Sequence, residues 1–176
     1  PGMSVSAAWA LTSQLIESPR DIAAETRALE NLAQWAGQFT PDLSLQAPAS
    51  LLLEVQGCLR LFGGLRGLSA QLQAGLKALG YHGVLAHAPT PLAAWLFAQA
   101  GIATRILDRH DLKRALSPLP LSLLHQRGNA MEKLAQMGVR TLGDCLKLPR
   151  DGFSRRFGQE ILDDLDRALG RLADPR

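Results

Sequence analysis

One short stretch of the chain combines a glycine turn with a helix start, an arrangement that can bind phosphate. Gly138-Val139 is followed by Thr141, and Asp144 stands three residues later. Thr141 is expected to cap a helix, with Asp144 completing the Ser/Thr-x-x-acid capping box. The first amides of a helix lack intrahelical partners, so they can bind an anion. This pattern is typical of half a helix-hairpin-helix, a unit that grips the nucleic-acid backbone, and equally of an ordinary helix turn.

Basic residues around this stretch favour the nucleic-acid interpretation. The expected phosphate contacts, besides Gly138 and Thr141, are Arg140, Lys147, Arg150, Arg155 and Arg156. The formal net charge of the chain is +3. Residues 1–104 hold 5 Lys/Arg and 6 Asp/Glu, whereas residues 105–176 hold 14 and 10. The positive excess therefore lies in the second segment, as in a phosphate-contacting module on a near-neutral scaffold. A well-solvated helical surface would give the same balance.

Carboxylates suited to metal-dependent phosphoryl transfer are scattered. Two-metal chemistry needs paired hard oxygen ligands. The adjacent pair Asp163-Asp164 lies in an expected helix with arginines, which favours a solvated face, and Glu54 stands alone in an expected strand. The remaining group, Asp108, His110 and Asp111, has no second cluster to complete it and is interpreted as a loop surface. The sequence predicts neither a bound metal nor a cofactor.

Hydrophobic periodicity predicts the elements that hold these residues. Helical spacing predicts helices over 21–39 and 66–79, each with one apolar stripe, and a third over 91–99. Alternation over 43–55 predicts a two-stranded hairpin, and 84–86 a further strand. This order indicates an α+β fold, with helices on one face of a mostly antiparallel sheet. The residues expected to be buried there are Leu29, Leu32, Leu53, Val55, Leu72 and Leu76.

The pattern changes after residue 106. Alternation disappears, prolines just beyond residue 117 indicate a linker, and helices are predicted over 129–137, 141–147 and 158–172. We therefore expect a sheet-containing domain over 1–117 and a small all-helical domain over 118–176.

Composition bounds the class of protein. The chain has 176 residues, of which 47% are hydrophobic and 20% charged, values of globular rather than disordered proteins. Its apolar runs are far shorter than the ~20 residues needed to cross a bilayer. Cys58 and Cys145 lie too far apart for a zinc ligand set. We expect a soluble, cytoplasmic protein with reduced thiols.

Several motifs together resemble the Y-family translesion DNA polymerases, from the end of the fingers through the palm and thumb. The run Leu53-Glu54-Val55-Gln56-Gly57 is similar to the family's Leu-Asp-Val-Thr-Gly after the catalytic strand, and residues 134–148 are similar to the thumb's helix-hairpin-helix. Residues 59–64, 148–150 and 155–158 are most similar to the ImuB branch of this family. The resemblance implies a palm-like domain over 1–117 and a thumb-like domain over 118–176. It also adds Arg127 and Lys133 to the expected DNA contacts.

Departures from the family pattern imply that catalysis is lost. The catalytic Asp and Glu of active members align with Ala49 and Ser50, and neither residue can hold Mg²⁺ as a carboxylate does. A lysine that reaches the incoming triphosphate falls at about Leu96. The family's remaining metal-binding Asp lies in a first strand that this chain lacks. The thumb's first Gly-x-Gly falls on residues 125–127, where Arg127 would supply a side-chain contact instead.

Three functions therefore remain open. The preferred one is a non-catalytic, polymerase-shaped DNA-binding adaptor of inducible (SOS-type) translesion synthesis and mutagenesis. The alternatives are an active error-prone polymerase and a protein-interaction scaffold that never contacts DNA. The resemblance further implies as partners the sliding clamp, an ImuA-like protein and an error-prone replicative-type polymerase, mostly through segments beyond the thumb.

Overall fold

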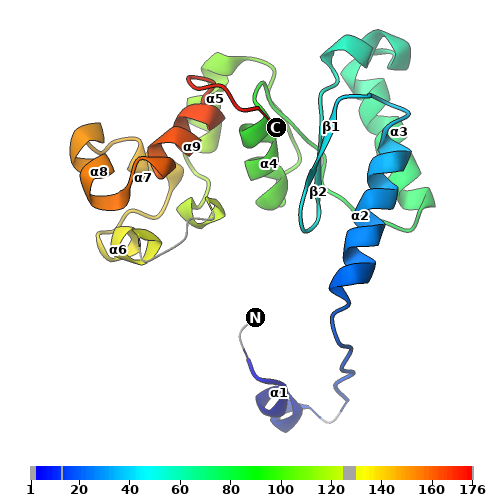
Figure 1. Ribbon diagram of the computed structural model, residues 1–176, viewed down its shortest axis with the longest axis horizontal. Helices are drawn as coiled ribbons and strands as arrows, with labels where there is room; N and C mark the ends of the chain where they lie inside the picture. Colours follow the sequence, from blue (N-terminus) through cyan, green and yellow to red (C-terminus); the bar gives the residue numbers. More distant parts are fainter. Residues whose placement is uncertain (1–2, 13, 125–129, 176) are drawn as a thin grey trace.

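The computed structural model describes residues 3–12, 14–124 and 130–175. Helix α1 (Val5–Leu11) lies apart from the rest of the molecule and buries none of its residues (Figure 1). The sheet-containing half then comprises α2 (Ile22–Ala36), β1 (Leu43–Gln46), β2 (Ser50–Leu53), the 3-10 helix η1 (Gln56–Phe62), α3 (Gly64–Ala78) and β3 (Ala86–His87). The rest comprises α4 (Pro91–Gln99), β4 (Thr104–Arg105), α5 (Arg109–Leu116), η2 (Leu121–Leu123), α6 (Ala130–Gln136), α7 (Leu142–Cys145), α8 (Arg150–Phe157) and α9 (Glu160–Ala168).

The strands form two small sheets. Strands β1 and β2 pair antiparallel, with Leu43 opposite Leu53, which confirms the predicted hairpin. Strands β3 and β4 pair in parallel over two residues each, a pairing that the sequence did not predict. Among the described residues, β2 and β3 each have one strand neighbour. A groove of about 690 Å³ lies between them, lined by residues of both strands.

Helices α2 and α3 pack against the hairpin through one apolar cluster, as their stripes predict. Its buried residues are Phe39, Leu68 and Leu72, with Leu53 and Val55 partly buried against them. Of the six residues expected to be buried, Leu29 and Leu72 are buried and the others are intermediate. The two helices approach closely where Gly75 faces Trp35, since a Cβ at Gly75 would lie 2.2 Å from the indole ring.

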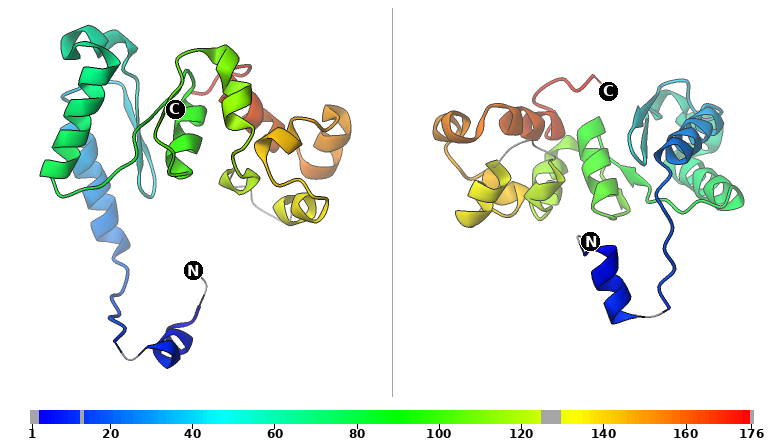
Figure 2. Two further views of the ribbon diagram at one scale, coloured as in Figure 1. Left: turned by 180° about the vertical axis from the view of Figure 1, so that it is seen from behind. Right: turned by 60° about the horizontal axis from the view of Figure 1, so that its bottom comes forward.

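Helix α4 lies on the other side of the hairpin from α2 and α3 (Figures 1 and 2). Thr90 caps its first turn and Pro91 supplies a preset first helical residue. Four of its nine residues, Leu92, Ala93, Leu96 and Phe97, are buried. Thr90 Oγ1 donates to the Ala168 carbonyl at 2.8 Å, so α4 is tied to the end of α9.

A second, larger apolar cluster joins α4 to every helix that follows it. It contains 19 buried residues between Leu92 and Ala168, drawn from α4 through α9 and the segments between them. One core therefore runs across residue 117, where the sequence placed a domain boundary. The division into 1–117 and 118–176 stays a prediction.

Three helices, α1, α5 and α8, were not predicted from the sequence. Asp108 caps the start of α5, since its carboxylate accepts from the His110 amide at 2.8 Å, and Asp111 pairs with Arg114 at 2.8 Å. The interpretation of these residues as a loop surface is therefore wrong, because Asp108 acts as a helix cap. Helix α8, with Gly152 inside it, was also not predicted.

Candidate nucleic-acid interface

The glycine turn lies between α6 and α7, and its backbone closes α6. Gly138 adopts φ = +81°, a left-handed conformation that favours glycine. The Gly138 amide donates to the Ala135 carbonyl at 3.0 Å, and the Val139 amide donates to the Leu134 carbonyl at 2.9 Å. Leu134 and Val139 are both buried, so the turn is anchored to the core on one side.

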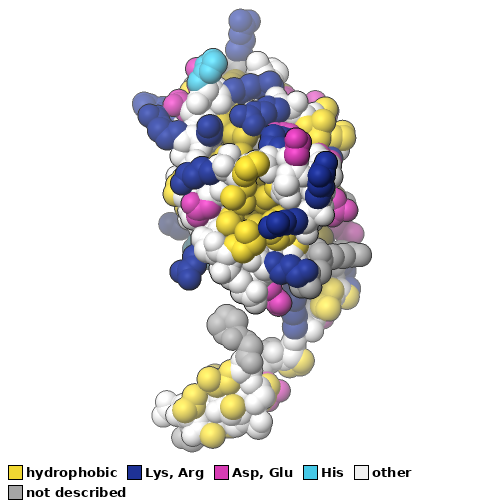
Figure 3. Space-filling view, turned by 90° about the vertical axis from the view of Figure 1, so that its left-hand side faces the viewer, with side chains coloured by type: hydrophobic (Ala, Val, Ile, Leu, Met, Phe, Trp, Pro, Cys, Tyr) yellow, Lys and Arg dark blue, Asp and Glu magenta, His cyan; other side chains and the backbone are white. Residues whose placement is uncertain are grey.

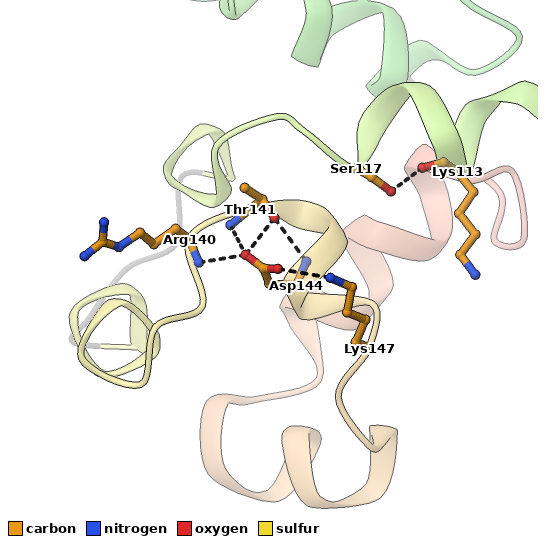
Figure 4. A network of polar contacts seen from close by, with 6 residues as sticks. All are labelled: Lys113, Ser117, Arg140, Thr141, Asp144 and Lys147. Atoms are coloured by element: carbon orange, nitrogen blue, oxygen red, sulfur yellow. Dashed lines mark hydrogen bonds and ion pairs between the residues drawn. The ribbon is translucent and has the colours of Figure 1, made fainter.

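A capping box starts α7, as the sequence predicted (Figure 4). Thr141 Oγ1 accepts from the Asp144 amide at 3.1 Å, and Asp144 Oδ2 accepts from the Thr141 amide at 3.2 Å and from the Thr141 hydroxyl at 2.8 Å. The hydrogen bond from the Thr141 hydroxyl is the main cause that lowers the pKa of Asp144, followed by that from the Thr141 amide. Asp144 is therefore held as a carboxylate within the turn.

The amides of this turn are already engaged, which corrects the expectation that those after Gly138 are available to a phosphate. The Arg140 amide lies 3.4 Å from Asp144 Oδ2. The Leu142 amide donates to the Leu119 carbonyl at 2.9 Å, and the Gly143 amide to Ser117 at 3.0 Å. Asp144 thus occupies the position at the helix start where an anion would bind, and the segment around Ser117 covers the rest. Any DNA contact here depends on side chains.

The predicted cations fall into two groups. Lys147 pairs with Asp144 at 3.4 Å, and Arg150 pairs with Asp166 through both of its terminal nitrogens. Within the part of the chain that the structure describes, the other four form no ion pair; these are Lys133, Arg140, Arg155 and Arg156. Arg127 lies outside the described residues. Unpaired cations are the ones that can neutralise phosphates without first breaking a bond within the protein.

Lys133 lies in the last turn of α6, and Arg155 and Arg156 lie in the last turn of α8. The surface at this end of the molecule shows hydrophobic side chains at the centre, with Lys and Arg around them and some Asp and Glu in between (Figure 3). A hollow of about 410 Å³ on these helices and the turn is lined by Lys133, Gln136, Met137, Arg156 and Phe157. Met137 and Phe157 were not singled out in the sequence. Their position in the sequence could have indicated them, since Met137 directly precedes Gly138 and Phe157 directly follows Arg156.

Ala49 and Ser50, which the sequence resemblance predicts at the places of the catalytic carboxylates, lie at the β1–β2 turn. Ala49 is exposed, and Ser50 begins β2 with its hydroxyl accepting from Gln99 Nε2 of α4 at 2.8 Å. Glu54 follows β2 and accepts from the Gln56 amide at 3.0 Å, so it serves the local turn. Among the described residues, no three His, Cys, Asp or Glu side chains gather as a metal-ligand group.

The adjacent acids of α9 support the solvated-face interpretation. Asp164 pairs with Arg167 at 2.9 Å, and Asp163 accepts from Gln159 Nε2 at 2.8 Å.

In the described ranges, no helix is both long and apolar enough to span a bilayer.

Solved structures define the class of fold. No family model matches the chain. The DinB protein from Sulfolobus solfataricus superposes with a TM-score of 0.74 at 16% identity, covering 99% of this chain and 53% of that one. A Dbh DNA polymerase in an insertion ternary complex gives a TM-score of 0.75 at 16% identity, covering 99% and 52%. The chain has the α+β fold of the Y-family DNA polymerases, over about half of their length.

Within that class, the sequence is similar to Protein ImuB of Caulobacter vibrioides. The protein of strain NA1000/CB15N is 31% identical over 174 residues, which are 99% of this chain and 38% of that protein. The protein of strain ATCC 19089 gives the same values. The chain thus spans well under half the length of these curated relatives. The resemblance to the ImuB branch, inferred from sequence motifs, is confirmed.

Proposed function

We propose that this chain is a non-catalytic, polymerase-like DNA-binding component of translesion synthesis and damage-induced mutagenesis. The observation that carries the proposal is the gathering of cations without acid partners at the α6 and α8 end of the molecule. The fold is that of DNA polymerases, and similarity to ImuB extends along the whole chain. A phosphate backbone is the ligand that such a cationic surface binds without reading sequence.

The binding is expected to be weak and dependent on salt. If Lys133, Arg140, Arg155 and Arg156 each neutralise one phosphate, log K falls against log salt with a slope of about −3.6. The dissociation constant then lies in the non-specific range of about 10⁻⁴ to 10⁻⁶ M. Because the amides near Gly138 are engaged, Gly138 and Thr141 contribute by shaping the turn that presents Arg140.

The absence of catalysis is the second half of the proposal. Ala49 and Ser50 supply no carboxylate at the turn where the family holds its metal ions, and the Ser50 hydroxyl is bound to Gln99. Leu96, the approximate position of the family's lysine, is fully buried in α4. A cation there would have no access to a triphosphate. Losing metal ligands removes the charge stabilisation that drives phosphoryl transfer.

An adaptor role also requires protein partners. The family resemblance implies contacts with a sliding clamp, an ImuA-like protein and an error-prone replicative-type polymerase in the bacterial cytoplasm. In this scheme the chain contributes DNA affinity, and the polymerase partner contributes synthesis.

A salt titration with labelled primer–template DNA tests the DNA contact. The double variant Arg155→Ala/Arg156→Ala should flatten the salt slope by about two units and weaken all DNA sequences alike. The matched control, Arg66→Ala/Lys77→Ala, removes two exposed cations from α3 at the far end of the molecule. If both variants flatten the slope equally, net charge and not this surface drives binding. If the unchanged chain shows no binding at low salt, the scaffold function replaces the proposal.

Primer extension tests the catalytic half. The chain should add no nucleotide to a primer in Mg²⁺ or Mn²⁺, and Ala49→Asp/Ser50→Glu should not create activity. Template-directed extension that Glu54→Ala abolishes would establish the active-polymerase alternative instead.

A further inference from the structure

The hollow at the α6 and α8 end differs in chemistry from a surface that only contacts phosphates. Its lining combines the thioether of Met137 and the ring of Phe157 with the amide of Gln136. Met137 is 55% exposed, and Phe157 is half-buried with its ring 5.0 Å from that of Phe153. An exposed apolar floor gains nothing from a phosphate, because phosphates stay hydrated or paired with cations. The floor requires an apolar or π-bearing group.

The charged residues that line the hollow determine the charge of the ligand. Lys133 and Arg156 line it, no acid lines it, and neither cation has an ion-pair partner among the described residues. Two positive charges beside an apolar floor match a ligand that carries a flat apolar face next to an anion. An unpaired nucleotide has this composition, since its base offers a π face and its phosphate a negative charge.

Duplex DNA does not fit the floor equally well. Its bases are stacked on one another, so their faces are unavailable to Met137 and Phe157. A single strand exposes those faces, and stacking on side chains tolerates any base. The polar Gln136 amide can contact a base edge without excluding the other bases.

Resting on the proposed function, we infer that the hollow between Lys133, Met137, Arg156 and Phe157 is a subsite for an unpaired nucleotide of single-stranded DNA. The base lies against Met137 and Phe157, and the adjoining phosphates lie near Lys133 and Arg156. The subsite gives this surface a preference for single-stranded over fully paired DNA.

The test compares a labelled oligo-dT single strand with a blunt duplex of equal length, using the full chain. Met137→Ala should weaken single-strand binding by about five-fold or more and leave duplex binding unchanged. Met3→Ala is the matched control, since Met3 is 59% exposed in the segment before α1 and should change neither. Phe157→Leu, which keeps an apolar side chain but removes the ring, should reproduce the loss; a thermal melt checks that each variant remains folded.

The outcomes separate this subsite from the proposed function. Salt-dependent duplex binding with no effect of Met137→Ala on the single strand would overturn the subsite and leave the proposed function intact. Equal weakening of both DNA forms would also overturn it. No binding of either form at low salt would remove both. Binding of a peptide of alternating Glu and Leu, lost in Met137→Ala while single-strand binding is unaffected, would assign the hollow to an acidic protein segment instead.

Discussion

The two halves of the molecule hold their shape in different ways. In the sheet-containing half, α2, α3 and the hairpin share a cluster with three buried residues, and a groove lies between β2 and β3. From α4 onward, a cluster of 19 buried residues joins all the helices. The four predicted DNA contacts that form no ion pair among the described residues lie on the second half, and the β1–β2 turn with Ala49 and Ser50 lies on the first. The surface proposed to bind DNA therefore lies on the half with the larger buried cluster, whereas Ala49 and Ser50 lie on the half with the smaller one.

The largest expected effect is on stability. Leu165→Ala in α9, where the leucine is 2% exposed, should lower the free energy of unfolding by about 2–5 kcal/mol because it opens a cavity in the large cluster. Leu53→Ala, at a half-buried position of β2, should cost clearly less. Denaturant titrations of both variants measure the difference. Equal losses of unfolding free energy in the two variants would contradict the difference in packing between the two halves.

A smaller effect links stability and binding at the turn. Asp144→Ala removes one side of the capping box and should cost about 1 kcal/mol. The same change frees the Thr141 and Arg140 amides and removes a negative charge, so DNA affinity should rise several-fold as stability falls. Asp151→Ala, which removes a like charge from the first turn of α8, is the control. A gain of the same size in the control would show that only net charge matters.

The smallest effect concerns pH and the sheet-containing half. Burial, and then the charge of Arg105, lower the pKa of His87, whose Nε2 lies 2.9 Å from Ser69 Oγ. As pH falls below about 6.5, the unfolded chain takes up this proton before the folded one, so stability decreases. The loss should be small, since the ring is only half-buried. Thermal melts between pH 5 and 7.5 should show a weaker slope in His87→Gln; an unchanged slope would assign the dependence to other groups.

Local chemistry was predictable from the sequence, and long-range contacts were not. Alternation of apolar residues predicts the β1–β2 hairpin, and Pro91 marks the start of α4. The four-residue motif from Thr141 to Asp144 predicts the capping box of α7. Helix α8 was missed because Pro149 and Gly152 indicate a turn, yet Phe153 is buried against other helices. The engagement of the Leu142 and Gly143 amides at the start of α7 could not be predicted either. Their acceptors on Leu119 and Ser117 lie more than 20 residues away in the sequence.

The apolar composition of α4 also gave no indication of which helices it packs against. Its residues are apolar on nearly all sides, so periodicity gave no direction for its buried face. The tie from Thr90 to Ala168 decides that α4 joins the later helices, and it spans 78 residues. The predicted boundary at 117 rests on the change of periodicity and on Pro118 and Pro120, and these local signals carry no information on the large cluster that begins at Leu92.

The groove between β2 and β3 has a consequence for behaviour at high concentration. A strand with one unpaired side displays backbone donors and acceptors that invite a strand from another molecule, the first step of aggregation. Here β2 has four residues and β3 has two, so each can offer an incoming chain only a few hydrogen bonds. The shortness of β2 and β3 thus protects both small sheets against pairing between molecules. Lengthening β2 past Glu54 is the change that would weaken this protection.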